Sequence, residues 1–218
     1  MPEFSDGADV AHEAKRDLRV TVLARRRSLT APARAEAAAR VQAELVSLVR
    51  RLRPTRLTAY VPVASEPGGG DLPAVLRAAL APAAELLLPV LRDDLDLDWA
   101  AYTDAASLRA AGRGLREPVG ALLGPAAVAT AGLVIVPALA VDRRGRRLGR
   151  GGGSYDRALA RVPAATLTVA LLHDGEFVDA VPGEEHDRPV RAVITPGAGL
   201  IEVPGVGRGS SSGRTRVR

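Results

Sequence analysis

The sequence contains no cysteine, a single lysine and few aromatic residues. Without cysteine, neither a disulfide framework nor a thiolate metal site is possible, and a reducing compartment is compatible with the chain. Only 3% of the residues are Phe, Trp or Tyr, too few for a surface on which nucleic-acid bases stack. The histidines do not have the spacing of a metal site, so we expect no zinc at His12, His173 or His186.

Long apolar segments are absent as well. The longest uninterrupted apolar run, residues 133–141, has nine residues, whereas a membrane-spanning helix needs about 20. The first 17 residues carry acids and have no apolar core, which argues against a secretory signal. These patterns predict a cytoplasmic protein that does not cross a membrane.

What the sequence contains is sufficient for one globular domain. Of 218 residues, 47% are hydrophobic and 25% charged, which allows a sizeable core. The net charge is +5, but residues 202–218 hold four arginines and one glutamate and so contribute +3 of it. This tail has too few apolar groups to offset the entropy of ordering. We expect a disordered end over residues 1–9, one domain over 10–201 and a disordered basic tail over 202–218.

The apolar pattern predicts two amphipathic helices followed by alternating strands and helices. The two helices are expected over residues 10–27 and 30–53. Further on, we expect strands at 57–61, 85–90, 97–102, 133–136, 167–172 and 190–195, and helices at 71–80, 103–111 and 155–162. This alternation is typical of a mostly parallel sheet covered on both faces, so the predicted fold class is α/β with three α/β/α layers. Ligands of such sheets bind beyond the carboxyl ends of strands.

The loop after residues 133–136 is rich in arginine and glycine. Five arginines fall within the eight positions from Arg143 to Arg150, and three consecutive glycines follow at 151–153. Such glycines let backbone amides converge on an anion where a helix N-terminus adds partial positive charge, and guanidinium groups match phosphate oxygens. The loop therefore predicts a phosphate site, although it is neither a Walker loop nor a dinucleotide-binding motif. A flexible surface loop and an arginine–glycine segment that binds nucleic acid remain alternatives.

Tyr155 and Asp156 directly follow this loop, at the start of a predicted helix. A carboxylate in a first helical turn favours the helix dipole by about 0.3–1 kcal/mol. Beside so many phosphate donors, Asp156 could equally hold magnesium against a nucleotide.

The stretch VPALAVDRRGRRLGRGGGSYDRAL, residues 136–159, resembles the strand, loop and helix of 5-formyltetrahydrofolate cyclo-ligases. The family pattern is roughly R-L-G-R-G-x-G-Y-Y-D, from which this sequence departs at Ser154, where the first tyrosine is usual. The resemblance covers about residues 14–195 and includes KRDLR at 15–19, YVPVASE at 60–66, REP at 116–118 and His186-Asp187. It implies an α/β architecture related to that of sugar-phosphate isomerases and CoA transferases.

Two cations near the start gain a role from this resemblance. Lys15 and Arg19 are four positions apart and so share a helix face, where they repel each other unless an anion neutralises them. A solvated surface is the alternative. Beside 29 arginines, Lys15 is the only lysine, which suggests that the position requires a compact ammonium group. The resemblance implies that both residues contact ATP.

The resemblance implies a functional role for several other residues, and for each a purely structural role is the alternative. Glu66 would bind folate, since a carboxylate suits the N–H donors of the pterin, with Val61 as an apolar neighbour; otherwise it is a loop residue. Asp187, otherwise a turn former, would complete a magnesium site with Asp156. Glu117 stays open between a folate contact and a structural role. We expect that Trp99 and Tyr102 serve packing.

The resemblance thus implies three groups of site residues. ATP would be bound by Lys15, Arg19, Arg147, Leu148, Gly149, Arg150, Gly151, Gly152, Gly153, Ser154 and Tyr155; 5-formyltetrahydrofolate by Val61, Glu66, Arg150, Gly151, Gly152, Gly153 and Ser154; and magnesium by Asp156 and Asp187. Arg147, Arg150 and Tyr155 would carry catalysis.

The implied reaction converts 5-formyltetrahydrofolate to 5,10-methenyltetrahydrofolate with release of ADP and phosphate. It requires positioning and charge neutralisation rather than a thiol or histidine base, in keeping with the absent cysteines and sparse histidines. An isomerase or transferase of related architecture would instead need a base or nucleophile, for which Glu66 or Glu117 are the candidates. A non-enzymatic alternative is a nucleic-acid binder acting through Arg143–Arg150 and the tail. We expect a monomer without a specific nucleic-acid partner.

Overall fold

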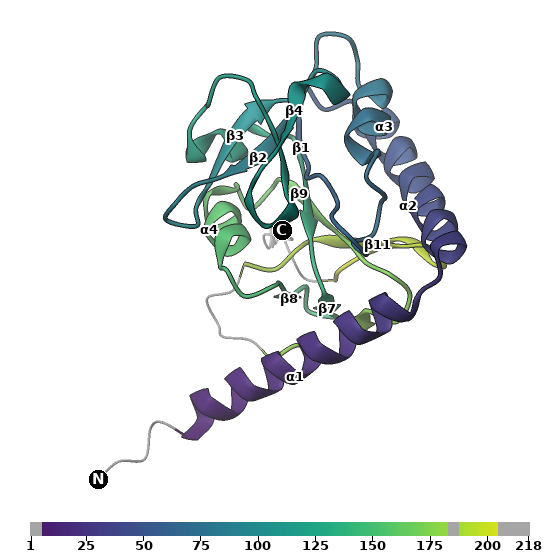
Figure 1. Ribbon diagram of the computed structural model, residues 1–218, viewed down its shortest axis with the longest axis vertical. Helices are drawn as coiled ribbons and strands as arrows, with labels where there is room; N and C mark the ends of the chain where they lie inside the picture. Colours follow the sequence, from purple (N-terminus) through teal and green to yellow (C-terminus); the bar gives the residue numbers. More distant parts are fainter. Residues whose placement is uncertain (1–5, 183–187, 205–218) are drawn as a thin grey trace, which may run out of the picture.

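The computed structural model describes residues 6–182 and 188–204, and a seven-stranded sheet runs through them (Figure 1). In the order β12-β11-β9-β6-β1-β2-β3, its five inner strands are parallel and its two edge strands antiparallel. The strands are β1 (Arg56–Thr58), β2 (Glu85–Leu91), β3 (Leu97–Ala101), β6 (Leu133–Pro137), β9 (Leu167–Leu171), β11 (Ala192–Thr195) and β12 (Gly199–Glu202). The predicted mostly parallel sheet is confirmed.

Helices cover both faces of this sheet, as the alternation of side chains in β6 requires. Leu133 and Ile135 pack toward helices α2 (Ala31–Leu52) and α3 (Leu72–Ala79). Val134 and Val136 point to the opposite face, toward α4 (Ser154–Arg161) and the 3₁₀ helix η3 (Pro125–Thr130). Because successive strand residues point to opposite faces, a continuous apolar strand builds two cores. The α/β/α architecture is therefore confirmed, with α2 and α3 on one side and α4 on the other (Figure 1).

The α2 helix shows how the sequence sets its own boundaries. The Thr30 hydroxyl accepts a hydrogen bond from the Ala33 amide, and a proline occupies the first turn. Arg53 ends the helix in the left-handed conformation, with its amide bonded to the Val49 carbonyl. Capping and proline placement act as expected for a helix of this kind, and the predicted span of 30–53 is confirmed.

Shorter elements surround the sheet. Two antiparallel pairs flank it, one formed by β4 (Leu108–Ala110) and β5 (Arg116–Pro118) and the other by β7 (Ala140–Asp142) and β8 (Arg147–Leu148). The remaining ones are β10 (Phe177–Val178), which pairs with β7, and the 3₁₀ helices η1 (Ala105–Ser107) and η2 (Gly112–Gly114).

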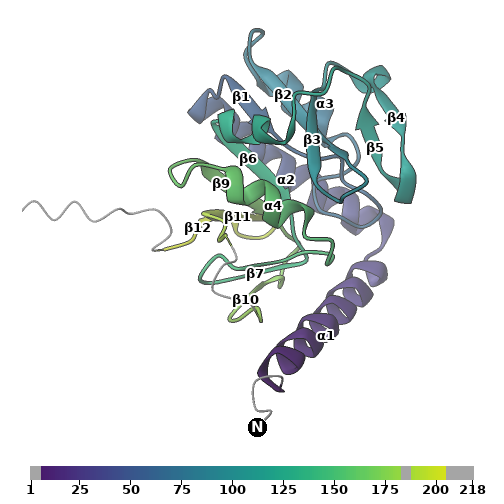
Figure 2. The ribbon, with the colours of Figure 1, turned by 90° about the vertical axis from the view of Figure 1, so that its left-hand side faces the viewer.

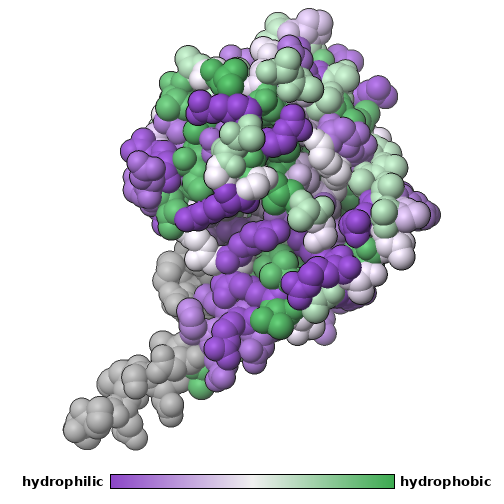
Figure 3. Space-filling model, in the orientation of Figure 1, coloured by the Kyte–Doolittle hydropathy of each residue, from purple (hydrophilic) through white to green (hydrophobic). Residues whose placement is uncertain are grey.

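Helix α1 (Asp6–Ser28) extends away from the body of the molecule, and its surface is mostly hydrophilic (Figures 1 and 3). Near its C-terminal end, Val22 packs in a small cluster with Leu139, Ala140 and Leu148. The contact area is thus concentrated in one part of the helix, next to the β7–β8 pair. Among the described residues, no helix combines the length and apolar character that crossing a membrane requires.

Three expectations at the level of elements are wrong. The helix expected over 103–111 is instead the single turn η1 followed by β4. Helix α1 starts at Asp6, so residues 6–9 belong to it rather than to a disordered end. At the other end, Glu202 closes β12 and Val203 is buried, so the tail does not start at 202. The rest of the expected tail lies outside the described residues.

Candidate active site

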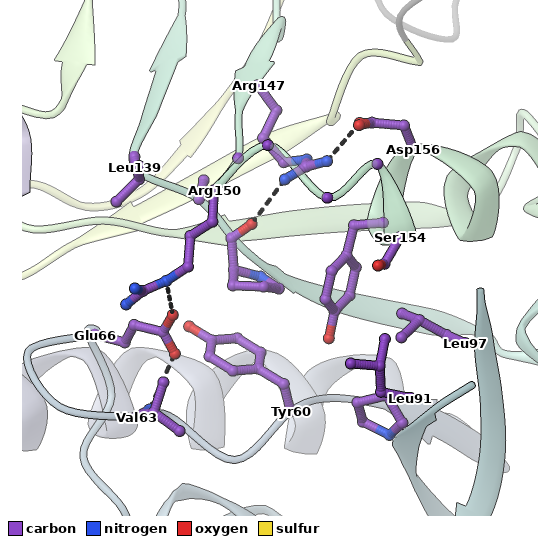
Figure 4. Close-up of a pocket in the computed structure, with 18 of the residues that line it drawn as sticks. Tyr60, Val63, Glu66, Leu91, Leu97, Leu139, Arg147, Arg150, Ser154 and Asp156 are labelled. Carbon is purple, nitrogen blue, oxygen red and sulfur yellow. Dashed lines mark hydrogen bonds and ion pairs between the residues drawn. The ribbon is translucent and has the colours of Figure 1, made fainter. Parts of the chain in front are cut away.

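A cavity of about 670 Å³ lies beyond the carboxyl ends of β1 and β6, where the fold class predicts the site. Its walls come from the loop after β1, the end of β2, the start of β3, the β4–β5 hairpin, the β8–α4 loop and one face of α1. Figure 4 shows the part around Glu66, Arg150, Leu91 and Leu97. The predicted site residues that line it are Lys15, Arg19, Val61, Glu66, Arg147, Leu148, Gly149, Arg150, Gly151, Gly152, Gly153, Ser154, Tyr155 and Asp156. Asp187 lies outside the described residues.

The β7–β8 turn that precedes the glycine loop is organised by Asp142. Its buried carboxylate accepts hydrogen bonds from the amides of Arg144, Arg146 and Val181 and from Nε of Arg146 at 2.7 Å. Burial by itself raises the pKa of Asp142, but the Arg146 side chain and these amides outweigh it and hold the pKa below its usual value. The carboxylate is therefore ionised, and it fixes the start of the loop.

Gly145 is required in the same turn. Its φ is 81°, a region that side chains rarely adopt, and a Cβ there would lie 2.3 Å from the Val190 carbonyl oxygen. The amide of Val190 also donates to the Gly145 carbonyl at 2.9 Å. Backbone approach this close leaves no room for any other residue type.

The glycine loop adopts the conformations that its composition predicts. Gly151 has φ of 104° and Gly153 has φ of 70°, and α4 begins directly after Gly153. No side chain caps this helix start. Free amide groups and the positive end of the helix dipole thus face the cavity together, which is the arrangement that binds an anion.

Arg147 is almost fully enclosed, with 5% of its side chain exposed. It donates to the Pro137 carbonyl at 3.2 Å and forms an ion pair with Asp156, and its guanidinium lies 5.8 Å from the centre of the Tyr155 ring. Its Nε has no partner among the described residues. Arg147 therefore joins the end of β6 to the first turn of α4.

Arg150 reaches across the cavity to Glu66 (Figure 4). The Nε of Arg150 lies 3.1 Å from Oε1 of Glu66, and the other carboxylate oxygen accepts from the Val63 amide at 3.0 Å. About half of the Arg150 side chain is exposed, whereas only 9% of the Glu66 side chain is. A nearly buried carboxylate, held by the Val63 amide, thus meets a half-exposed cation of the glycine loop.

Two tyrosines, Tyr60 and Tyr155, line the same cavity as Glu66 and Arg150. The Tyr155 hydroxyl is buried and has no hydrogen-bond partner within the described residues, and Tyr60, which the sequence analysis gave no role, lines the same cavity. Burial and, secondarily, the charge of Glu66 raise the pKa of both tyrosines above the usual value. Both hydroxyls are therefore neutral. The Tyr60 hydroxyl donates to the Pro67 carbonyl at 3.4 Å, so of the two only the Tyr155 hydroxyl is available as a donor to a ligand.

Helix α1 brings Lys15 and Arg19 to the glycine loop. Nε of Arg19 donates to the Gly149 carbonyl at 3.0 Å, and the same guanidinium lies near Gly151. Lys15 makes no ion pair or hydrogen bond in the described part of the chain, and His12, one turn earlier, also lines the cavity. The predicted shared helix face is thus directed at the loop.

A buried ion pair holds α1 against the walls of the cavity. Arg26 and Glu176 are each 1% exposed and form two hydrogen bonds of 2.7 Å. Arg26 also donates to the Ala138 carbonyl, and Glu176 accepts from the amide of His173, whose ring contacts the Ser65 carbonyl at 3.0 Å. Since Ala138 lines the cavity and Ser65 precedes Glu66, this network connects both sides of the site.

A metal site is not assembled by the described residues alone. Asp156 is about half exposed and pairs with Arg147. Over residues 6–182 and 188–204, no three His, Cys, Asp or Glu side chains gather in a group that could hold a metal ion. Of the histidines, His12 and His173 belong to no such group within the described residues, and His186 lies outside them.

Sequence reasoning missed most of one wall of the cavity and named only its Arg116 and Glu117, through the family resemblance. This apolar and basic wall consists of Pro89, Leu91, Leu97, Arg113, Leu115, Arg116 and Glu117. Glu117 is 7% exposed and accepts a hydrogen bond from the Leu91 amide at 2.9 Å, which is a structural role. Only the folded sheet edge brings these residues to the site, since nothing in the spacing of Pro89, Leu91, Leu97, Arg113 and Leu115 marks them. Trp99 and Tyr102 are buried in the cores, as expected.

The chain is similar to known proteins over most of its length. Residues 11–196 match the model of the 5-formyltetrahydrofolate cyclo-ligase family. A 5-formyltetrahydrofolate cyclo-ligase of Mycolicibacterium smegmatis is 39% identical over 193 residues, covering 86% of this chain and 96% of the relative. One from Escherichia coli is 45% identical over 65 residues, 29% of this chain and 36% of its own.

The chain belongs to the 5-formyltetrahydrofolate cyclo-ligase family. It is therefore an enzyme, a ligase of folate one-carbon metabolism. The solved structure of 5,10-methenyltetrahydrofolate synthetase from Aquifex aeolicus superposes with a TM-score of 0.71 at 25% identity, over 92% of this chain and 97% of that one. A second synthetase, from Mycoplasma pneumoniae, is 15% identical with a TM-score of 0.64 and shows the shared fold. The family resemblance noted in the loop is thus confirmed.

Proposed function

We propose that this cyclo-ligase converts 5-formyltetrahydrofolate to 5,10-methenyltetrahydrofolate with consumption of ATP in the presence of magnesium. The observation that carries the proposal is the Arg150–Glu66 contact. It places a cation of the glycine loop, suited to phosphate, 3.1 Å from a nearly buried carboxylate suited to a pterin. Two ligands of different chemistry can therefore meet at one point of the cavity.

The phosphate side of the proposed site consists of the glycine loop and the face of α1 opposite it. The uncapped start of α4 offers amide donors, and Lys15 has no partner within the described residues. We assign nucleotide binding to these groups and to Arg19, Arg150, Gly149, residues 151–153 and Ser154, because several donors converge where charge develops during phosphoryl transfer.

The folate side lies around Glu66. Its carboxylate is held by the Val63 amide and can accept from the amino and ring N–H groups of the pterin. Val61 and the apolar residues at the end of β2 and the start of β3 supply a surface for the rings. The unpartnered Tyr155 hydroxyl is the proposed donor to the substrate, because an unpaired buried hydroxyl costs about 1–3 kcal/mol that a bound ligand relieves.

The proposed reaction has two steps. The formyl oxygen attacks the γ-phosphorus, and the bond from that phosphorus to the leaving ADP oxygen breaks. N10 then attacks the formyl carbon, the carbon–oxygen bond to phosphate breaks, and the proton of N10 is lost. Arg150 neutralises charge on the transferred group, whereas Arg147, whose guanidinium is already engaged, orients Asp156 and Tyr155.

Magnesium fits this site to the extent that one carboxylate is available. Asp156 is half exposed at the mouth of the loop, and one or two carboxylates with phosphate oxygens and water are what this ion requires. Asp187 remains the proposed second ligand. When bound, the ion would neutralise phosphate charge. We further propose that the enzyme acts as a monomer in the cytoplasm and requires no nucleic-acid partner.

The proposal is tested by mixing protein, 5-formyltetrahydrofolate and magnesium-ATP and following the methenyl chromophore in the near ultraviolet. We expect an ATP-dependent signal, and a loss of kcat by about 100-fold in Arg150→Ala, because an aimed charge contributes on this order to a developing anion. Arg143→Ala is the matched control, since Arg143 is exposed and pairs with Asp179 outside the cavity. Absence of any ATP-dependent signal in the wild type would overturn the proposal.

A further inference from the structure

Two arginines of the cavity are used neither by the fold nor by the proposed phosphate site. Within the described residues, the cavity cations that make hydrogen bonds or ion pairs are Arg19, Arg147 and Arg150. Arg113 and Arg116 also line the cavity, yet both are exposed and neither has such a partner. They belong to the β4–β5 hairpin, which lies at the upper right in Figure 2, above α1.

The turn between β4 and β5 fixes the position of the Arg113 backbone. Its amides close the turn twice, from Leu115 to Gly112 at 3.2 Å and from Ala111 to Leu115 at 2.9 Å. Arg113 and Gly114 have φ of 61° and 73°, as in the tight hairpin turns that normally carry Asn-Gly. An arginine is unfavourable at that backbone position. The backbone conformation of the turn favours Asn or Gly at position 113, but the sequence has an arginine there.

The surface between these arginines and Glu66 is apolar. Leu91 and Leu97 lie on the side of the cavity away from Glu66 and Arg150 (Figure 4). The hairpin continues this wall, because Glu117 of β5 is bonded to the Leu91 amide and Leu115 lies between the two arginines in sequence. The cavity thus runs from a carboxylate, over an apolar wall, to a pair of free guanidinium groups.

We propose that Arg113 and Arg116 bind the carboxylates at the glutamate end of the folate substrate. The inference rests on the proposed function and names the part of the substrate that these residues select. The substrate consists of a pterin, an aromatic ring and a glutamate with two carboxylates, in that order. The cavity offers the Glu66 carboxylate, the apolar wall and the two guanidinium groups in the same order, and each matches one part of the substrate. Phosphates have their own donors at the glycine loop, so the observations favour carboxylates here.

The test compares two ligands by titration calorimetry without ATP. 5-Formyltetrahydrofolate carries the glutamate with its two carboxylates, whereas 5-formyltetrahydropteroate lacks it and ends in a single ring carboxylate. We expect the wild type to bind the folate about 3- to 10-fold more tightly, since exposed pairs contribute modestly and salt screens them. In Arg113→Ala/Arg116→Ala this preference should fall to near unity, with the affinity for magnesium-ATP unchanged.

Arg109→Ala is the matched control. Arg109 lies on the same hairpin and is exposed, but it does not line the cavity. An equal loss of preference in this variant, or an unchanged preference in the double variant, would overturn the inference. A loss of magnesium-ATP affinity as large as the loss of folate affinity would overturn it too, because the arginines would then serve phosphates.

The two proposals fail differently. Ligand preference without ATP-dependent methenyl formation would contradict the proposed function and leave the hairpin assignment standing. Turnover of both ligands with equal Kd and equal KM would contradict the hairpin assignment and leave the proposed function standing. A wild type that binds neither ligand would overturn both.

Discussion

Arg147 and Arg150 show how two residues of one motif take different tasks. The Arg147 side chain is 5% exposed. Its guanidinium donates to the Pro137 carbonyl, forms an ion pair with Asp156 and lies over the ring of Tyr155. Arg150 is half exposed and makes one contact, to Glu66. Only the second is free to follow a ligand. Both are arginines of the same loop, so burial separates the proposed positioning residue, Arg147, from the proposed binding residue, Arg150.

At this scale, the role of Asp156 can be tested by Asp156→Asn. Asparagine keeps an oxygen that accepts from Arg147, so the fold should be unaffected, but it binds a divalent cation less well. We expect KM for magnesium-ATP to rise about 10-fold while the Kd for 5-formyltetrahydrofolate stays unchanged. Steady-state kinetics and calorimetry measure the two quantities.

Asp179→Asn provides the comparison, since Asp179 is exposed and pairs with Arg143 away from the cavity. Equal losses for nucleotide and folate in Asp156→Asn would count against a role in metal binding and favour a general role in holding Arg147.

The sequence identified these residues because each carries a local signal. Lys15 stands out as the only lysine, and the glycines of 151–153 have a backbone requirement of their own. Tyr60 and Arg113 carry no such signal. They become visible only when the loop after β1 and the β4–β5 turn meet at one cavity.

At the scale of elements, the long periodic segments were predictable and one alanine-rich segment was not. Residues 103–111 favour a helix by composition, yet Asp104 caps only the turn η1. The chain then pairs Leu108–Ala110 with Arg116–Pro118, because it reverses at Arg113 and Gly114, which both have positive φ. Strand pairing with a distant partner outweighs the weak helix propensity of a short segment.

The β7–β8 turn gives a pH-dependent prediction. Because its hydrogen bonds hold the folded pKa of Asp142 below the usual value of about 4, Asp142 stabilises the fold above that pH. This contribution is lost as the pH falls below about 4 and through the folded pKa. Asp142→Asn should therefore lower the free energy of unfolding at pH 7 by about 1–3 kcal/mol and make it depend less on pH below 4. Urea unfolding between pH 7 and 3 measures both.

Asp93→Asn is the control, since Asp93 is exposed in the β2–β3 turn. A pH dependence below 4 that is as steep in Asp142→Asn as in the wild type would show that other carboxylates carry it. Asp96, whose pKa the Arg161 side chain lowers, is the first alternative.

At the scale of the whole molecule, the Arg26–Glu176 pair joins α1 to both sides of the cavity. Glu176→Gln keeps the shape but leaves the Arg26 charge buried without compensation. We expect it to lower the free energy of unfolding by about 3–5 kcal/mol, measured by chemical denaturation. The double variant Arg26→Met/Glu176→Leu should be more stable than Glu176→Gln, because it removes both charges.

Glu36→Gln is the matched control for this pair. Glu36 and Arg40 form an exposed ion pair of the same type with the same 2.7 Å distance, and its loss should cost less than about 1 kcal/mol. A cost for Glu176→Gln as small as that of Glu36→Gln would show that water reaches Arg26.

The sequence by itself determined the fold class and, through the family resemblance, the reaction class, and it predicted a phosphate site at the glycine loop. Each of these depends on neighbouring residues, whose periodicity and composition are readable along the chain. Only the tertiary structure decided that Arg147 is enclosed, that Arg150 meets Glu66, and that the β4–β5 hairpin adds Arg113 and Arg116 to the cavity. These are contacts between residues far apart in the chain, and they arise from how the sheet orders its strands.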